Sequence, residues 1–125
     1  MGSGTESIAE RIAREVLRWP GTSSQPHRFG GVEFRYAGHE LRHLHGSRRA
    51  DLPFPVRVRE ELVSSGRASP HHILPQTGWV TCYIHGEDDL ADDFADVVAL
   101  FRLNYDRIAS ATAIHGLAQP HEMES

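Results

Sequence analysis

The chain has 125 residues and a formal net charge of −4, and arginine supplies all 13 of its basic residues. A chain of this length fits one domain, and its acidic balance provides no basic field for a nucleic acid. The sequence shows neither a leader nor an apolar run of membrane-spanning length, and its single cysteine excludes an internal disulfide. We therefore expect a cytoplasmic protein that binds neither nucleic acid nor a membrane.

The first element along the chain is expected to be an amphipathic helix over residues 7–18. Apolar residues recur there every four positions, which is the spacing of one helix face. Ser7 and Glu10 have the spacing of a capping box at its start, and Ser3 with Glu6, one turn earlier, is the alternative. A first strand is expected within residues 21–31, at a sheet edge, because Pro26 lacks a backbone N–H for ladder pairing.

The next stretch predicts a β-hairpin in which Ala37 and Gly38 form the turn between residues 32–36 and 39–45. With regular pairing, one face of the hairpin carries four pairs: Tyr36 opposite His39, Phe34 opposite Leu41, Val32 opposite His43 and Gly30 opposite His45. The other face carries two pairs: Arg35 opposite Glu40 and Glu33 opposite Arg42. Two opposite-charge pairs indicate that the second face is solvated. His43 and His45 are therefore expected on the core side.

The second half of the chain is expected to contain a short helix, two strands and a long helix. Asp51 can cap the short helix, which follows the prolines of residues 51–55. The strands are expected at residues 68–74 and 79–85, and the apolar spacing of residues 90–108 predicts the long helix.

The predicted fold class is α+β. We expect a curved, mainly antiparallel sheet of about five strands with three helices, in the order α-β-β-β-α-β-β-α. The single domain is expected to span residues 1–114. The tail over residues 115–125 has no hydrophobic periodicity and is expected to be disordered.

Nine histidines stand out in the composition, and three chemistries can use them. His43 and His45, on one strand face, lie about 6.5–7 Å apart and can chelate one ion if His72, His27 or His39 adds a third ligand. A histidine near an apolar wall can also act as a general acid or base. The third alternative is structural, with the rings bonded to backbone carbonyls. We favour acid/base chemistry over a metal and expect no cofactor.

Several other residues are candidates for the walls of a pocket. Tyr36 and Trp79 are expected beside the histidines, where aromatic rings can line a small-molecule site. Arg28, next to two glycines, can hold an anion. Cys82 lies on the apolar face of its strand and is expected to behave as a small hydrophobic residue.

Five segments together resemble the family of small proteins that carry a luciferase-like domain of unknown function. They are PHRFGGVEFR, ELRHLHG, DLPFPVRVREEL, PHHILPQTGWVTCYI and LFRLNYDRI. The resemblance covers the chain from about Pro26 to about Ile108. It implies a His-x-His element on a strand and a further histidine before a hydrophobic-proline step, which fall on His43, His45 and His72. The order of elements is also similar to that of YjbR-type double-wing domains, which have a frataxin-like α+β fold.

These patterns predict a small-molecule enzyme or ligand-binding protein whose catalytic residues are His43, His45 and His72. The ligand-binding residues are expected to be His27, Arg28, Tyr36 and Trp79. The alternative is a non-catalytic interaction module with structural histidines, in which the Trp79–Tyr83 face meets a partner. The sequence does not identify the substrate. It leaves open whether the protein forms a homodimer and whether it is an enzyme.

Overall fold

The protein is an α+β domain built on an open antiparallel sheet. The computed structural model describes residues 7–26, 31–71, 77–85 and 90–118. These residues form six strands in the spatial order β1-β2-β3-β4-β6-β5, and every neighbouring pair is antiparallel. The elements are α1 (Ile8–Val16), β1 (Thr22–Pro26), β2 (Val32–Tyr36), β3 (His39–His45), β4 (Arg49–Pro53), α2 (Val56–Ser64), β5 (Ser69–Pro70), β6 (Trp79–Tyr83) and α3 (Leu90–Ala118).

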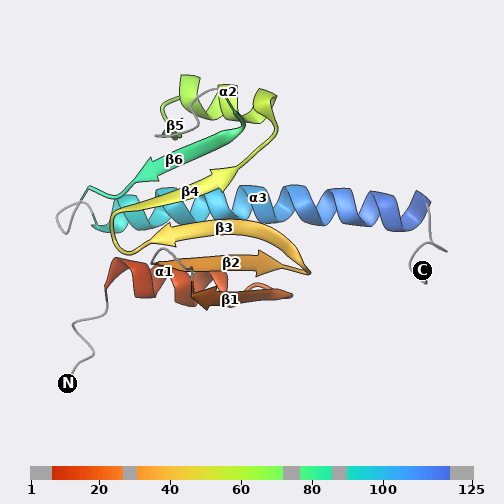
Figure 1. Cartoon of the computed structure of the whole chain (residues 1–125), viewed down its shortest axis with the longest axis horizontal. Coiled ribbons are helices and arrows are strands. Elements are labelled where there is room, and N and C mark those ends of the chain that lie inside the picture. Colours follow the sequence, from red (N-terminus) through yellow and green to blue (C-terminus); the bar gives the residue numbers. More distant parts are fainter. Residues whose placement is uncertain (1–6, 27–30, 72–76, 86–89, 119–125) are drawn as a thin grey trace.

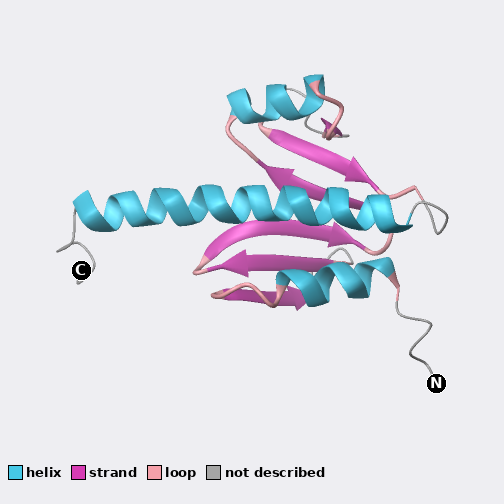
Figure 2. Ribbon diagram, turned by 180° about the vertical axis from the view of Figure 1, so that it is seen from behind, coloured by secondary structure: helices cyan, strands magenta, loops and turns pink. Residues whose placement is uncertain are grey.

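Two of the helices lie on the same face of the sheet. Figures 1 and 2 show α3 lying along the middle of the sheet, behind β3 and β4, and α1 lying behind β1 and β2. The third helix, α2, contacts β5 and β6 at the far end of the sheet. One sheet face therefore packs against α1 and α3, and we refer to the opposite face as the open face.

The predicted first helix is confirmed. In the capping box, the Ser7 backbone N–H donates to Glu10 Oε1 at 2.9 Å and the Glu10 N–H donates to Ser7 Oγ at 3.1 Å. This arrangement satisfies two of the N–H groups that a helix start leaves without partners. Ile8, Ile12 and Val16 are buried, so the predicted apolar stripe faces the sheet.

The hairpin forms, but its register changes at a β-bulge. The pairs Tyr36 with His39 and Arg35 with Glu40 are confirmed. Beyond them Phe34 pairs with Arg42, Glu33 with His43 and Val32 with Leu44, so the predicted pairs at Phe34, Glu33 and Val32 are wrong. The pair of Gly30 with His45 lies outside the described residues.

The reason for the bulge is the spacing of the leucines in β3. Leu41 and Leu44 are three residues apart, whereas side chains on one face of a regular strand are two apart. One extra residue in β3 turns both leucines to the core, where they are 0% and 1% exposed. Arg42 takes up the distortion with φ 109°. Burying Leu44 is worth about 2 kcal/mol, and the helix side of the sheet offers an imidazole no comparable gain.

A strand replaces the predicted cap of the second helix. Residues 49–53 form β4 between β3 and β6, so Asp51 is a strand residue. With β4 the sheet has six strands, close to the five expected, and the predicted α+β class is confirmed. Ala50 and Leu52 are fully buried, which gives β4 a core face. α2 starts after Pro55, whose fixed φ suits a helix start, and no side chain caps it.

The last strand and the last helix follow the prediction closely. Val80 and Cys82 of β6 face the core, while Trp79, Thr81 and Tyr83 alternate onto the open face. α3 extends to Ala118, so its last four residues fall within the predicted tail. Although α3 has 29 residues, neither it nor another described helix has the sustained apolar stretch that a membrane span requires.

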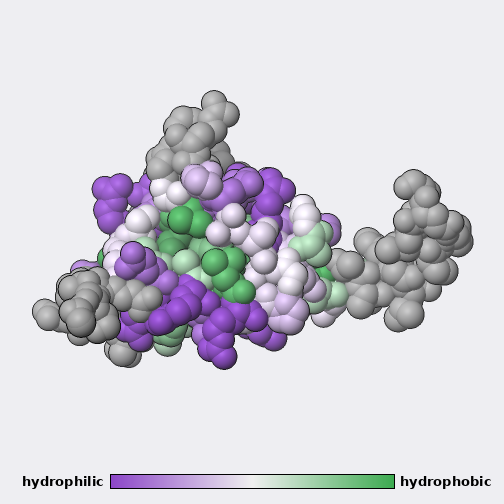
Figure 3. Space-filling model, turned by 90° about the horizontal axis from the view of Figure 1, so that it is seen from below, coloured by the Kyte–Doolittle hydropathy of each residue, from purple (hydrophilic) through white to green (hydrophobic). Residues whose placement is uncertain are grey.

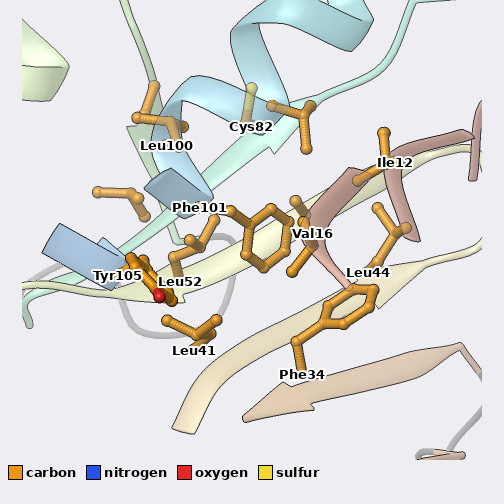
Figure 4. Close-up of a cluster of buried hydrophobic side chains, with 14 of the residues drawn as sticks. Ile12, Val16, Phe34, Leu41, Leu44, Leu52, Cys82, Leu100, Phe101 and Tyr105 are labelled. Carbon is orange, nitrogen blue, oxygen red and sulfur yellow. The ribbon is translucent and has the colours of Figure 1, made fainter. Parts of the chain in front are cut away.

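The core lies between the sheet and the two helices. Figure 4 shows Phe101 of α3 against Phe34 of β2, and their ring centroids are 5.3 Å apart in an edge-to-face arrangement. Ile12 and Val16 of α1 close one side of this cluster. Seen from the β1 edge, the surface is hydrophilic around a smaller hydrophobic area (Figure 3). The core thus fixes the sheet from one side and leaves the open face to polar side chains.

Candidate functional site

The strand registers place a row of polar side chains across the open face. Glu33 pairs with His43, His43 with Asp51, and Asp51 with Thr81, so one residue from each of four strands stands in line. Directly opposite residues of neighbouring strands point to the same face. A second row is formed by His45, Arg49 and Tyr83, which lie two residues later in β3 and β6 and two residues earlier in β4.

Asp51 is the centre of this arrangement, and its side chain is only 3% exposed. Thr81, which is fully buried, donates a hydrogen bond from Oγ1 to Asp51 Oδ1 at 2.7 Å. The other oxygen, Oδ2, lies 3.1 Å from His45 Nε2. A carboxylate removed from water needs such donors, because burying it without compensation costs several kcal/mol. The two oxygens therefore have different surroundings: Oδ1 accepts a hydrogen bond from a hydroxyl, and Oδ2 faces an imidazole.

Two further cationic or titratable groups surround the same oxygen. Arg49 Nε lies 3.5 Å from Asp51 Oδ2, and His71 Nε2, from the residue that follows β5, lies 3.9 Å from it. The His71 side chain is 11% exposed and the Arg49 side chain 25%. Two imidazoles and one guanidinium, from three separate segments of the chain, therefore lie around one oxygen of Asp51.

Trp79 forms an aromatic wall beside this group. The guanidinium carbon of Arg42 lies 4.9 Å from the centre of the indole, within the range of a cation–π contact. The His71 ring lies 5.6 Å from the indole and the His43 ring 6.3 Å from it, between centroids. His43 in turn meets His45 edge-to-face at 5.5 Å. The histidines and the tryptophan therefore form one continuous ring cluster.

Acidic side chains border the cluster on the β2 side, and each has an arginine partner. Arg35 Nε lies 3.2 Å from Glu33 Oε2, and its Nη2 lies 3.4 Å from Glu40 Oε2. Arg42 also contacts Glu40. Glu33 is 9% exposed, so this network is partly shielded from water.

The structure brings together some of the residues that the sequence singled out. His43, His45 and Trp79 share the open face, whereas the expectation that the two histidines face the core is wrong because of the bulge. Tyr36 lies apart from them, stacked on Tyr105 of α3 with ring centroids 4.1 Å apart. The positions of His27, Arg28 and His72 lie outside the described residues.

The sequence reasoning missed Asp51, Thr81, Arg49 and His71 as site residues. Asp51 was assigned to a helix cap, so the strand that carries it and Arg49 was not recognised. The missed signal is the alternation of Arg49-Ala-Asp-Leu-Pro53, in which Ala50 and Leu52 form an apolar face and the charged residues the opposite one. Nothing in the sequence distinguishes His71 from its neighbour His72.

The lone cysteine is not part of the site. Burial, followed by the charges of Asp96 and Asp93, raises the pKa of the Cys82 thiol to about 11. The thiol is therefore protonated near neutral pH and is a poor nucleophile, as expected. Among the described residues, no group of three or more His, Cys, Asp or Glu side chains is arranged to hold a metal ion.

Comparison with known proteins adds a family assignment. The model of the family described as Luciferase domain matches residues 38–104, which is more than half of the chain. The matched segment runs from the hairpin turn into α3 and contains His43, His45, Asp51, Trp79 and Thr81. No curated protein and no solved structure matches the chain, so the likeness to double-wing domains stays a prediction. The match to the family model shows that the chain belongs to the Luciferase domain family.

Proposed function

We propose that the open face binds a small molecule and that His45, oriented by Asp51, acts on it as a general acid or base. The observation that carries this proposal is the buried carboxylate of Asp51, which lies 3.1 Å from His45 Nε2 and 3.9 Å from His71 Nε2. A protein that needs only stability gains little from burying a carboxylate among titratable rings. Such groups are instead typical of sites that move protons.

In this proposal each atom has a defined role. The 3.1 Å contact fits a hydrogen bond in which His45 Nε2–H donates to Asp51 Oδ2. This bond selects the tautomer with the proton on Nε2 and keeps the basic lone pair on Nδ1. When Nδ1 accepts a proton from a substrate, the carboxylate stabilises the imidazolium that forms. His71, on the same oxygen, is a second candidate for proton transfer.

One observation favours the alternative, a non-catalytic interaction module. Tyr83 is 45% exposed at the end of β6, on the open face, and exposed aromatic side chains are enriched at protein interfaces. In that alternative the ring cluster is structural and the partner is another protein or a second copy of the chain. We also propose a cytoplasmic location, supported by the chain's single cysteine, which remains a free thiol.

A ligand screen with matched variants tests the proposal. The wild type, His43→Ala, His45→Ala, Asp51→Asn and His39→Ala are examined with a library of small metabolites by ligand-observed NMR, and their melting temperatures are recorded. His39 is the control, because it is an exposed histidine at the turn end of β3.

We expect the ligands that bind the wild type to bind His39→Ala with the same affinity. Their affinity for the other three variants should fall at least tenfold, which is more than any loss of folded protein indicated by the melting temperatures explains. Unchanged binding in these variants, together with a large fall in their melting temperatures, contradicts the proposal and supports structural histidines.

A further inference from the structure

The charges of the open face indicate which class of small molecule it binds. Each carboxylate among its described residues already has an arginine within 4 Å: Arg35 for Glu33, Arg42 for Glu40 and Arg49 for Asp51. The three histidines can only add positive charge when they take up protons. The face is therefore balanced or positive within a chain whose formal charge is −4, and this balance favours an anion as ligand.

Arg49 is the arginine that is placed to receive that anion. Its contact with Asp51 is made through Nε, at the inner end of the guanidinium. Its two terminal amino groups donate no hydrogen bond to another residue in the described part of the chain. The side chain is 25% exposed, so these groups are within reach of a ligand. By contrast, Arg35 bridges two carboxylates and Arg42 lies between Glu40 and Trp79.

The register places Arg49 directly beside the proposed catalytic histidine. Arg49 pairs with His45 on one side and with Tyr83 on the other. Directly opposite residues of antiparallel strands have Cα atoms roughly 4.5–5.5 Å apart, and their side chains stand next to each other. An anion on the outer edge of the guanidinium is therefore adjacent to the imidazole that Asp51 orients.

On these grounds we infer that the substrate carries a carboxylate or phosphate group that binds the terminal amino groups of Arg49, beside His45. The inference rests on the proposed function and names its substrate class. The planar guanidinium presents two parallel N–H groups that match carboxylate and phosphate oxygens. It holds the anion while His45 Nδ1 exchanges a proton with a neighbouring atom of the same molecule.

Histidine NMR with two simple anions tests the inference without a known substrate. Sodium acetate and inorganic phosphate are titrated separately, at fixed pH and ionic strength, into the full chain labelled with ¹⁵N-histidine. The variants are Arg49→Ala, Arg49→Lys and the matched control Arg48→Ala, which removes the exposed arginine one residue earlier. Circular dichroism spectra establish that each variant is folded.

We expect saturable shifts of the His45 ring signals in the wild type and in Arg48→Ala. The affinity should fall at least tenfold in Arg49→Ala and by less in Arg49→Lys, which keeps the charge but loses the paired donors. A response to acetate alone supports a carboxylate substrate, and a response to phosphate alone supports a phosphate ester. Equal affinity in Arg49→Ala, or no shift with either anion, overturns the inference. Uncharged hits in the metabolite screen that depend on His45 would then still support the proposed function.

Discussion

Asp51 and Thr81 show how one buried hydrogen bond orients a charged group. Thr81 is fully buried and donates to Asp51 Oδ1 at 2.7 Å, which leaves Oδ2 directed at His45. Without the hydroxyl, the carboxylate keeps its burial but loses the donor that fixes its orientation. The effect on stability should be large, because hydrogen bonds to charged groups contribute about 1.5–3 kcal/mol.

We expect Thr81→Val, which has nearly the same shape, to lower the free energy of unfolding by about 2 kcal/mol. Thr81→Ser keeps the hydroxyl and should recover most of that loss. Urea unfolding curves of the three proteins provide the comparison. A valine variant as stable as the wild type would show that the Thr81 hydroxyl does not hold Asp51.

Cys82 provides a prediction about pH. Its pKa rises from 9.0 to about 11 in the folded protein, mainly because of burial. The unfolded thiol therefore loses its proton first, so the stabilisation from the neutral thiol is complete below pH 9.0 and is lost as pH rises toward 11. We expect the stability difference between the wild type and Cys82→Ala to shrink over this range. A difference that stays constant from pH 8 to pH 11, measured by chemical unfolding, would contradict the assigned pKa.

At the scale of single elements, the β2–β3 hairpin shows what alternation predicts and where it stops. The turn and the two pairs next to it follow from the sequence, because Ala37-Gly38 joins two strands of matching pattern. Beyond them the prediction assumed that every second side chain of β3 faces the core. Leu41 and Leu44 are three residues apart and both face the core. The burial of a second leucine outweighs regular pairing, and the bulge moves His43 and His45 to the open face.

This register predicts losses of stability of very different size for two neighbouring substitutions in β3. Leu44 is 1% exposed, so Leu44→Ala should lower the free energy of unfolding by about 2–5 kcal/mol. His43 is partly exposed, and His43→Ala should cost about 1 kcal/mol or less. Thermal or urea unfolding of both variants gives the two losses of stability to be compared. If His43→Ala is the more damaging change, the bulge is wrong and the regular register is right.

β4 is the element that the sequence did not reveal, and the site depends on it. Two prolines and an aspartate favour a helix start over a strand, and the helix does begin, but only at residue 56. Pro53 is tolerated because it is the last residue of the strand. The five residues of β4 are short for a confident pattern, and only pairing with β3 and β6 shows that Asp51 belongs to the sheet.

For the whole molecule, the long helix and the fold class were predictable because many residues share one period. Val97, Phe101, Tyr105 and Ile108 are all buried, as the spacing of α3 predicts. The site was predictable only in its residue types, since histidines and a tryptophan do lie together. Its charged centre comes from contacts between β4, β6 and the residue after β5, which are set by tertiary structure and leave no local pattern.

The same assembly predicts the metal content of the protein. Arg49 lies 3.5 Å from the oxygen that His45 and His71 approach, and a divalent cation there would be repelled by the guanidinium. We therefore expect the protein purified without chelator to contain well under one equivalent of zinc, nickel, copper or iron by elemental analysis. Any activity should persist in excess EDTA. One full equivalent of zinc, lost together with function on chelation, would make the histidines metal ligands.

The central claim is that Asp51 orients His45 for proton transfer and that His71 lies against the same carboxylate oxygen. Long-range ¹H–¹⁵N spectra of the histidine rings, recorded for the wild type and Asp51→Asn, test it most directly. We expect His45 to carry its proton on Nε2 in the wild type, and the substitution to shift the ring signals of His45 and His71 while those of the exposed His39 stay in place. A wild-type His45 with the spectrum of an exposed histidine, unchanged in Asp51→Asn, would contradict the claim.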